Sequence, residues 1–322
     1  YGGFSIPFDR KMSGDYEFAR GVENVDGRDV FNRIIKKTPE LFDPILPGKP
    51  MPLQLTTACF KGKNEQGEVL IFTGMPVSWK DTSAQTGKID LTRGLFIFDS
   101  QFNEISKKRE RKSITLSGIS ASDSFVIDQR VESLPAGDFD FSMEVIDHTN
   151  KRVGVFRNKL SVPDFRTDAL QMSDVLIAKS ITKSSGQDTL PLFREFSIVP
   201  AITRTFTAGA QIHVYFELYN LSLQSGLGSY RIEFSLAPAK TDKNSIGSAI
   251  SSFLSKIGLR SDKPEVVTAS YTFTGESPDE ALNQTIDLAG QEAGEWILTV
   301  LVKDRISGEM MERKMNFLIV NR

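Results

Sequence analysis

From residue 51 onward, apolar and polar residues alternate with a period of two, in short runs that Gly, Pro, Asn and Asp interrupt. Half-buried antiparallel strands have this pattern, because successive side chains of a strand point to opposite faces of the sheet. The runs that show it best are 53–60, 69–75, 95–98, 139–146, 212–219, 230–236, 267–273 and 296–302. No βαβ rhythm separates them, so the pattern predicts an all-β protein of immunoglobulin-like antiparallel β-sandwiches.

Two segments of the chain repeat each other at an offset of 157 residues. Residues 136–147 read AGDFDFSMEVID, and residues 293–304 read AGEWILTVLVKD. In each copy we expect a glycine turn, a strand that begins with a buried aromatic residue, and an Asp at the strand end that accepts hydrogen bonds from turn N–H groups. The repeated structural positions are Gly137, Phe139 and Asp147 in the first copy and Gly294, Trp296 and Asp304 in the second. Calcium ligation is the alternative role for the two Asp residues.

The repeat predicts two tandem sandwich domains, 51–165 and 166–322. Earlier strands correspond at a smaller offset of 142, since Gly67 precedes VLIFTGMP and Gly209 precedes IHVYFELYN. The growing offset implies an insertion in the second copy, where apolar residues from Ile246 to Ile257 follow helical spacing and Gly258 follows as a stop. We therefore expect one short amphipathic helix near 246–258, packed on the second domain or on a partner.

Residues 1–50 do not fit the repeat. They carry apolar side chains but are too few to form a core of their own, so we interpret them as an N-terminal extension or the tail of a preceding domain. The chain begins with Tyr1, and its first residues lack the charged and apolar regions of a signal peptide. We expect a processed protein or part of a longer one, whose first 50 residues contact a neighbouring domain or subunit.

Charge and cysteine content remove several classes of function. The chain has 322 residues with 39 Lys and Arg against 41 Asp and Glu, a net charge of -2, so no broad positive field attracts nucleic acid. Cys59 is the only cysteine, which excludes an internal disulfide and a thiolate metal cluster. No run approaches the roughly 18 apolar residues of a membrane span. The sequence therefore predicts neither a nucleic-acid-binding protein nor a membrane-spanning one.

Candidate catalytic residues are few. Only His148, expected in a solvated hairpin turn, and His213, expected on one strand face, offer an imidazole, and no metalloprotease, hydrolase-elbow, phosphate-loop or dinucleotide motif occurs. A glycosidase-type pair needs only two carboxylates, for which the strand candidates are Asp138, Asp140, Glu144, Asp147, Glu217 and Glu233. We expect most of them to face solvent. The sequence predicts no enzyme, no cofactor, no metal and no small-molecule ligand.

The sharpest charge feature is KKRERK at residues 107–112, between Ile105 and Ile114. We expect it to be a solvated hairpin tip between two strands, with contact to an anionic surface as the alternative.

Several stretches together resemble a known group of proteins. These are PDFRTDALQMSDVLIAKSI, ITRTFTAGAQIHVYFELYNLSL, SYRIEFSL and AGEWILTVLVKDRISGEMMERKMNFLIV, which begin at residues 163, 202, 229 and 293. They are similar to the C-terminal β-sandwich region of bacterial GWxTD-domain proteins and of von Willebrand A-related exported proteins. The GWxTD motif and the DxSxS metal motif are both absent here, so no functional residue of either family transfers.

The resemblance implies a periplasmic or extracellular bacterial protein. With the missing catalytic motifs, it favours a non-enzymatic structural or protein-binding component of an envelope or extracellular assembly, which acts through a protein partner or self-assembly. A carbohydrate-binding or enzyme-accessory module is the alternative, and it would need a row of exposed aromatic residues, whereas the chain has 2 Trp and 6 Tyr.

Overall fold

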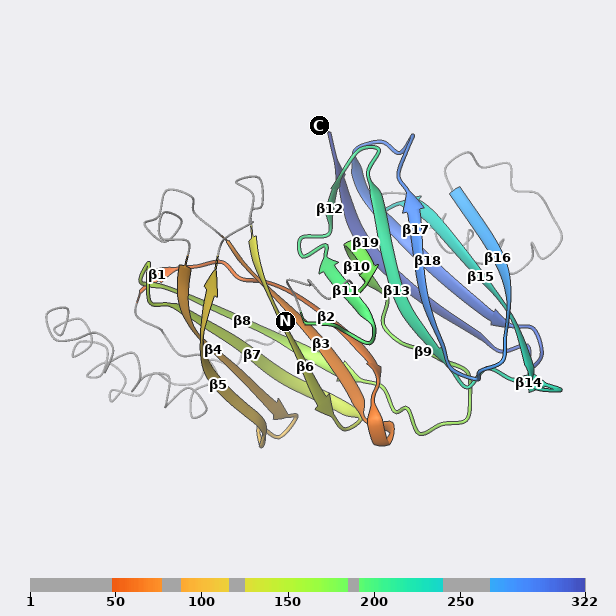
Figure 1. Cartoon of the computed structure of the whole chain (residues 1–322), viewed down its shortest axis with the longest axis horizontal. Coiled ribbons are helices and arrows are strands. Elements are labelled where there is room, and N and C mark those ends of the chain that lie inside the picture. Colours follow the sequence, from red (N-terminus) through yellow and green to blue (C-terminus); the bar gives the residue numbers. More distant parts are fainter. Residues whose placement is uncertain (1–47, 77–87, 116–124, 185–190, 240–266, 322) are drawn as a thin grey trace, which may run out of the picture. The chain divides into compact units, whose positions relative to one another are not determined.

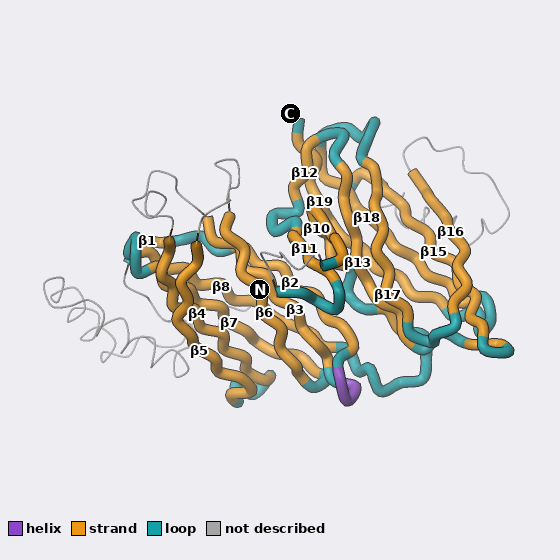
Figure 2. Tube along the Cα trace, in the orientation of Figure 1, coloured by secondary structure: helices purple, strands orange, loops and turns teal. Residues whose placement is uncertain are grey.

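The computed structural model describes residues 48–76, 88–115, 125–184, 191–239 and 267–321. Within these ranges the protein is nearly all β-strand, with one short 3-10 helix, η2 (Lys63–Glu65), as Figure 2 shows. The predicted all-β fold class is confirmed. The helix expected near 246–258 and the N-terminal extension up to residue 47 lie outside the described residues.

The strands of the described residues form four sheets, and their arrangement can be followed in Figure 1. The first has the order β1 (Lys49–Pro50), β8 (Arg152–Val162), β7 (Gly137–Asp147), β4 (Lys88–Asp99) and β5 (Glu104–Thr115). The second has the order β2 (Gln54–Lys61), β3 (Gly67–Pro76) and β6 (Phe125–Leu134). The third has the order β11 (Phe196–Pro200), β10 (Leu176–Lys183), β13 (Gln211–Tyr219) and β17 (Glu280–Asp287), and β9 (Gln171–Met172) also pairs with β13. The fourth has the order β12 (Thr205–Thr207), β19 (Met310–Val320), β18 (Gly294–Asp304), β15 (Leu227–Pro238) and β14 (Leu223–Gln224), and β16 (Val267–Gly275) also pairs with β15.

The chain divides into two compact units that interleave along the sequence. The first unit holds Met75–Val126 and Asp138–Ser161 together with the residues up to Leu53, and the second holds Gln54–Gly74, Ile127–Gly137 and Val162–Arg322. The predicted domains, 51–165 and 166–322, follow the sequence repeat, whereas these units follow compactness. The domain boundaries therefore stay a prediction.

The sequence repeat has a counterpart in the strands. β7 and β18 lie 157 residues apart at both of their ends, and each is followed by a hairpin to its neighbour, β8 or β19. The strand on the other side also corresponds, because β7 pairs with β4 and β18 pairs with β15. One step further out, β5 pairs with β4 in the first sheet and β16 pairs with β15 in the fourth. The strand order β8-β7-β4-β5 is therefore matched by β19-β18-β15-β16.

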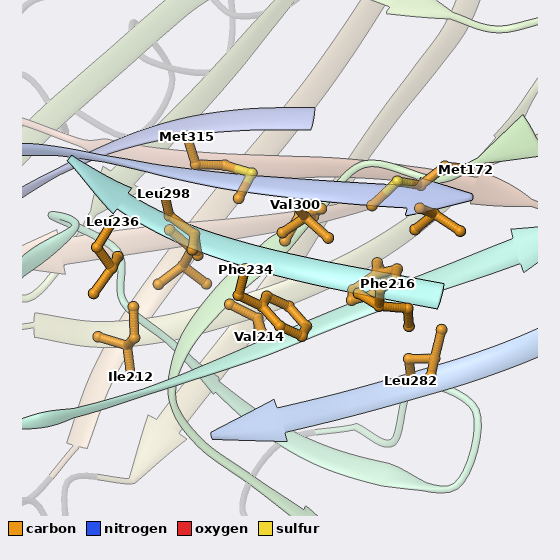
Figure 3. Close-up of a cluster of buried hydrophobic side chains, with 14 of the residues drawn as sticks. Met172, Ile212, Val214, Phe216, Phe234, Leu236, Leu282, Leu298, Val300 and Met315 are labelled. Carbon is orange, nitrogen blue, oxygen red and sulfur yellow. The ribbon is translucent and has the colours of Figure 1, made fainter. Parts of the chain in front are cut away.

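The second unit contains a sandwich core between the third and fourth sheets (Figure 3). Alternate residues of β13, from Ile212 to Leu218, face alternate residues of β15 and β18, such as Phe234 and Val300. All are under 5 % exposed, which explains why these strands show the clearest alternation in the sequence. The core thus fixes one face of β13 and leaves the side chains of Tyr215, Glu217 and Tyr219 on the other face.

The charge run at 107–112 is not a hairpin tip. It lies inside the twelve-residue strand β5, which pairs with β4 from Lys88 to Phe98. β5 is the outermost strand of its sheet, and most of the run is exposed. An edge strand can be polar on both faces, because only one side of it is hydrogen-bonded and charges there discourage pairing with other chains. The prediction of a loop was wrong for this reason.

Candidate functional site

The repeated glycine and aromatic positions have matching geometry in the two copies. Gly137 and Gly294 have φ angles of 147° and 152°, a region that favours glycine because it has no side chain. Two residues later, Phe139 and Trp296 are buried, with 5 % and 7 % of their surfaces exposed. The Trp296 indole N–H also donates a 2.9 Å hydrogen bond to the Glu292 carbonyl, which satisfies its polar edge.

The two repeated Asp residues cap their hairpin turns. Asp147 Oδ1 accepts hydrogen bonds of 3.0 Å from the backbone N–H groups two and three residues later. Asp304 Oδ1 accepts from the corresponding groups of Ile306 and Ser307, at 2.8 and 3.3 Å. Both side chains are fully buried. In the described residues no group of three His, Cys, Asp or Glu side chains could hold a metal ion.

Both histidines are held by neighbouring strands. His148 lies in the turn after β7, as the sequence predicts, but it is half-buried and shares a 2.8 Å hydrogen bond with the Thr92 hydroxyl. His213 shares a 3.0 Å hydrogen bond with the Thr285 hydroxyl across the β13–β17 pair. Each of these hydrogen bonds joins two neighbouring segments of a sheet.

The expectation that most of the six strand carboxylates face solvent fails at three of them, the turn residue Asp147 and two others. Asp138 is exposed, and Asp140 is half-buried in an ion pair with Lys159. Glu233 is also half-buried, beside Arg231. Glu144 and Glu217, by contrast, are buried with 2 % and 6 % of their surfaces exposed. Alternation predicts which face of a strand is polar, but it cannot predict what covers that face.

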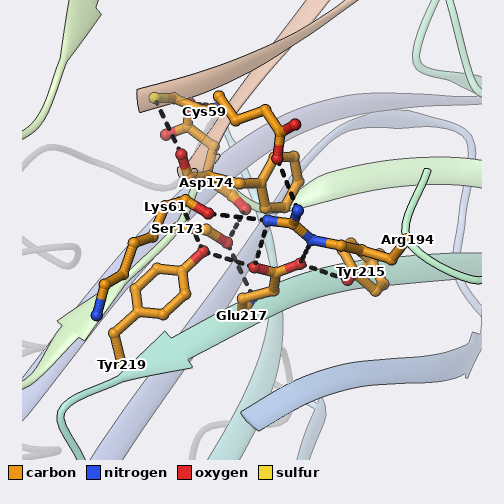
Figure 4. Close-up of polar contacts among 10 residues, drawn as sticks. Cys59, Lys61, Ser173, Asp174, Arg194, Tyr215, Glu217 and Tyr219 are labelled. Carbon is orange, nitrogen blue, oxygen red and sulfur yellow. Dashed lines mark hydrogen bonds and ion pairs between the residues drawn. The ribbon is translucent and has the colours of Figure 1, made fainter. Parts of the chain in front are cut away.

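Glu217 is the centre of a buried polar cluster (Figure 4). Its Oε1 accepts hydrogen bonds from the Tyr215 hydroxyl at 2.6 Å and from Arg194 Nε at 2.9 Å. Its Oε2 accepts from the Tyr219 hydroxyl at 2.7 Å and from Arg194 Nη2 at 3.2 Å. A carboxylate offers about four acceptor positions, so these four contacts use all of them. We call Arg194, Tyr215, Glu217 and Tyr219 the Glu217 network.

The strand geometry explains why three members of the network converge. Tyr215, Glu217 and Tyr219 are alternate residues of β13, so their side chains lie on one face, opposite the sandwich core. Phe60 of β2 and Phe193 cover this face, with ring centroids 5.6 and 6.1 Å from that of Tyr215. The apolar cover removes water, and so every polar atom beneath it needs a partner within the protein.

Arg194 reaches Glu217 from a tight turn. Phe193 and Phe196 exchange two backbone hydrogen bonds of 3.0 Å, and Arg194 between them has a φ of 54°. A residue with a long side chain rarely adopts this left-handed backbone conformation, which costs about 1–3 kcal/mol. The guanidinium gains compensating contacts, since Nη1 donates to Glu68 Oε2 at 2.6 Å and Nη2 also donates to the Lys61 carbonyl at 2.9 Å. We infer that the turn is held in this conformation by what Arg194 binds.

The network also fastens the strands β2 and β3 to the rest of the second unit. The Tyr219 hydroxyl accepts from the backbone N–H of Lys61, which is 158 residues away in the sequence. A second contact lies beside it, where Cys59 N–H donates to Asp174 Oδ2 at 2.9 Å and Asp174 N–H donates to the Cys59 carbonyl at 3.0 Å. Ser173 joins the two contacts, because its hydroxyl accepts from Glu217 N–H and donates to the Asp174 carbonyl.

The electrostatics of the network favour one protonation state. Burial and the Glu217 charge both raise the pKa of Tyr215 and of Tyr219 above that of a free phenol, so both hydroxyls stay donors. Burial alone would lower the pKa of Arg194, but Glu217 and Glu68 raise it above its usual value. Burial also raises the pKa of the Cys59 thiol to about 12, which keeps it protonated and unreactive.

The arrangement can hold segments together but offers no vacant polar atom at Glu217 to a ligand. Sequence reasoning named Glu217 but assigned it to a solvated face, and it missed Arg194, Tyr215 and Tyr219. The available signal was the order Tyr-Phe-Glu-Leu-Tyr from Tyr215 to Tyr219, which places two hydroxyl donors on either side of a carboxylate on one strand face. Arg194 is a single basic residue in a turn, and no pattern in the sequence marks it.

Comparison with known proteins finds solved structures that align with this chain at low sequence identity and low TM-score. No family model matches the sequence, and no curated protein sequence matches it. Among solved structures, red sea bream transglutaminase aligns over 93 % of this chain and 34 % of its own length, with 8 % identity and a TM-score of 0.23. The C-terminal domain of the Streptococcus agalactiae AgI/II polypeptide BspA aligns over 84 % of this chain and 99 % of its own, with 11 % identity and a TM-score of 0.23. Bacteroides uniformis β-glucuronidase aligns over 82 % of this chain and 32 % of its own, with 8 % identity and a TM-score of 0.26.

Proposed function

We propose that this chain is a non-enzymatic structural or protein-binding component of a bacterial envelope or extracellular assembly. The observation that carries the proposal is the Glu217 network, because all four acceptor positions of its carboxylate are used within the protein. A catalytic carboxylate must reach a substrate atom directly or through one water. Glu217 instead joins segments that lie far apart in the sequence, as a rigid structural element would.

The repeated Asp residues support the same function. Asp147 and Asp304 are fully buried at matching places in the repeat, and both accept hydrogen bonds from turn N–H groups. Buried carboxylates that serve turns and strand contacts stabilise loops at the ends of a sandwich. A stable sandwich with fixed end loops is suited to holding a position in an assembly and presenting its sheet edges to a protein partner.

The bacterial periplasm or cell exterior is the location that we propose, on the basis of the resemblance to exported sandwich proteins. No helix in the described ranges is long and apolar enough to cross a membrane. The proposed mode of action needs neither a cofactor nor a small molecule, and protein partners or further copies of the chain are its ligands.

Cell fractionation with cross-linking in the native organism tests the location and the binding role together. We expect the chain in the envelope fraction or in the medium, cross-linked to a protein or to itself, with cytoplasmic and periplasmic marker proteins as controls. Recovery in the cytoplasm without a cross-linked partner would contradict the proposal.

A hydrolase panel on the purified full chain tests the non-enzymatic part. We expect no turnover by the wild-type chain. If turnover were present in the wild-type chain and lost in a folded Glu217→Gln variant, the carboxylate would have a catalytic role and the non-enzymatic assignment would be wrong. The amide is matched in shape to the carboxylate, so circular dichroism should show an unchanged fold.

A further inference from the structure

Strand β16 lies at the outer edge of the fourth sheet (Figure 1). All nine of its residues pair with β15 on one side, from Val267 with Leu236 to Gly275 with Gly228. In the described part of the chain no strand pairs with its other side. An edge of this length presents a row of backbone N–H and C=O groups that another strand can bind.

The sequence of β16 lacks the usual protection of an edge strand. It reads VTASYTFTG, with no charged residue and no Pro. The other edges in the described sheets are short, as in β11 and β12, or they carry charges, as in β5. β17 has an acidic residue at each end, Glu280 and Asp287. Among the described edge strands, β16 therefore offers the longest uncharged pairing surface.

Aromatic side chains extend from the sandwich core to this edge. The ring of Phe273 stacks on that of Tyr230, with centroids 5.5 Å apart, and Tyr271 contacts both Phe273 and Phe234. Tyr230 and Phe234 are buried in the core, whereas Tyr271 is 47 % exposed. A strand added beside β16 would cover the exposed part of Tyr271 and continue the sheet.

We propose that β16 is a homodimerisation edge, at which the β16 strands of two copies of this chain pair antiparallel about a two-fold axis at Tyr271. This inference deepens the proposed function by naming a partner and a surface. A two-fold contact brings the same residues together from both copies, so a strand can self-pair only if its own charges do not repel. β16 meets this condition because it has none.

The register centred on Tyr271 is self-complementary. It places Ala269 of each copy opposite Phe273 of the other on the aromatic face, and the two Tyr271 rings beside each other. On the opposite face Ser270 meets Thr272. Aromatic pairs and Ser–Thr pairs across antiparallel strands are stabilising. The same operation on β5 would bring two runs of five basic and one acidic residue together, so the matching strand of the first sheet is protected where β16 is open.

The oligomeric state of the full chain in solution tests this inference. Sedimentation equilibrium of the 322-residue chain should show a monomer–dimer equilibrium, and Tyr271→Lys should raise the dimer dissociation constant by at least about tenfold, because two like charges would meet at the axis. The matched control is Ile306→Lys, an exposed apolar residue in the turn after β18, which should leave the dissociation constant unchanged. A wild-type chain that stays monomeric at high micromolar concentration would overturn the proposal.

Cysteine cross-linking tests the register itself. Residues directly opposite each other in antiparallel strands have Cα atoms about 4.5–5.5 Å apart, within the range that a disulfide spans. Under mild oxidation Tyr271→Cys should therefore form a covalent dimer. Thr274→Cys on the same edge should not, because the two copies of that position would lie roughly 20 Å apart at about 3.4 Å per residue. The native Cys59 is fully buried and should not compete.

Each cross-linking result decides the proposal. Equal cross-linking of both variants, or of Thr274→Cys alone, would show that copies do not meet at Tyr271. Absence of a covalent dimer from Tyr271→Cys would show that no copy binds this edge. Such failure is distinguishable from failure of the proposed function, since a monomeric chain that is cross-linked to another envelope protein in cells would keep the structural role and lose only the self-pairing edge.

Discussion

The two copies of the repeated sheet have the same strand order, but their outer strands differ in charge. In the first copy the outer strand β5 carries KKRERK, whereas in the second the outer strand β16 has no charged residue and exposes Tyr271. The inner strands β7 and β18 match residue by residue at their glycine, aromatic and Asp positions. Duplicated sandwiches can therefore keep the residues that fold them while the edge strands, which the core does not constrain, diverge towards protection or pairing.

The network around Glu217 marks a second difference between the copies. The 142-residue offset between Gly67 and Gly209 carries Glu217 onto Met75, a buried apolar residue of β3. At this position the first copy therefore has a buried thioether, and the second has the carboxylate of an ionic cluster. The ionic cluster of the second copy connects β13 to β2 and β3. It therefore helps to hold these two strands, which come early in the sequence, within the second unit.

The largest effect should come from the matched aromatic positions. Trp296→Ala and Phe139→Ala each leave a cavity in a buried site and should lower the free energy of unfolding by about 3–5 kcal/mol. Urea titration followed by circular dichroism measures this loss, and hydrogen exchange should place it at β18 for the first variant and at β7 for the second. The control Trp296→Phe copies the first repeat into the second and should cost less. A loss below about 1 kcal/mol for either Ala variant would contradict the inference that Phe139 and Trp296 have equivalent structural roles.

The difference between Glu217 and Met75 can be removed by placing Met at position 217. Glu217→Met leaves the Arg194 guanidinium and two phenols without their acceptor, and it should destabilise the chain by about 2–3 kcal/mol, less than for a fully buried pair because Arg194 is partly exposed. Glu217→Met with Arg194→Met removes both charges and should recover part of that loss. If the double variant were no more stable than Glu217→Met in urea titration, the cost would come from the shape of the site and not from the unpaired charge.

The hydrogen bonds that Asp304 accepts in its turn should make the stability of the second copy depend on pH. Burial alone would raise the pKa of Asp304, but hydrogen bonds from the N–H groups of Ser222 and Ile306 hold it below its usual value. A lowered pKa in the folded state stabilises the protein above the unfolded pKa of about 3.9, and this stabilisation is lost as the pH falls through the folded pKa. Asp304→Asn should cost about 1–2 kcal/mol at pH 7.

The role of Asp304 can be tested by measuring the free energy of unfolding as the pH is lowered. Below about pH 4 the wild-type chain should lose stability more steeply than Asp304→Asn, because the variant has no carboxylate to protonate. Asp147→Asn, the matched variant in the first copy, should also weaken its turn. Parallel acid limbs for wild type and Asp304→Asn would contradict the role of the ionised carboxylate.

The smallest effect on stability should follow from making β5 resemble β16. Lys107→Thr with Lys108→Thr removes two exposed positive charges from the edge and should change the free energy of unfolding by no more than about 0.5 kcal/mol. We expect more self-association than in the wild-type chain, measured by light scattering at rising concentration, because the charges oppose edge pairing. Unchanged scattering would mean that the charges on β5 do not protect it.

The sequence predicts strands well where one face is apolar. The alternation in β13, β15 and β18 is clear because one set of their side chains fills the core of the second unit. It fails for β5, which is polar on both faces, and for Glu217, whose face of β13 is polar in sequence yet covered by Phe60 and Phe193. Cover of this kind depends on segments more than 20 residues away along the chain, which no local period records.

The repeat was the strongest predictor of structural residues. Its Gly, aromatic and Asp positions recur because a turn with positive φ, a buried ring and a capped hairpin each depend on local geometry. Arg194 had no such signal, since its role arises from long-range contacts with Lys61, Glu68 and Glu217. The interleaved units were equally hidden, because compactness in space leaves no mark on the order of strands.

The pairing of β2 with distant partners has a consequence for the order in which the protein can fold. Lys61 meets Tyr219, and the sandwich that contains Tyr219 is completed by β18 and β19, which end at Asp304 and Val320. A ribosome adds about 5–20 residues per second, so β2 leaves it roughly 10–50 seconds before the last of these strands. The rings that pack on Phe60 belong to Phe193 and to Tyr215 of β13, and the sandwich that contains β13 is incomplete until then. During that interval the new chain has an exposed apolar strand, and a chaperone that binds extended apolar segments would find its target in β2.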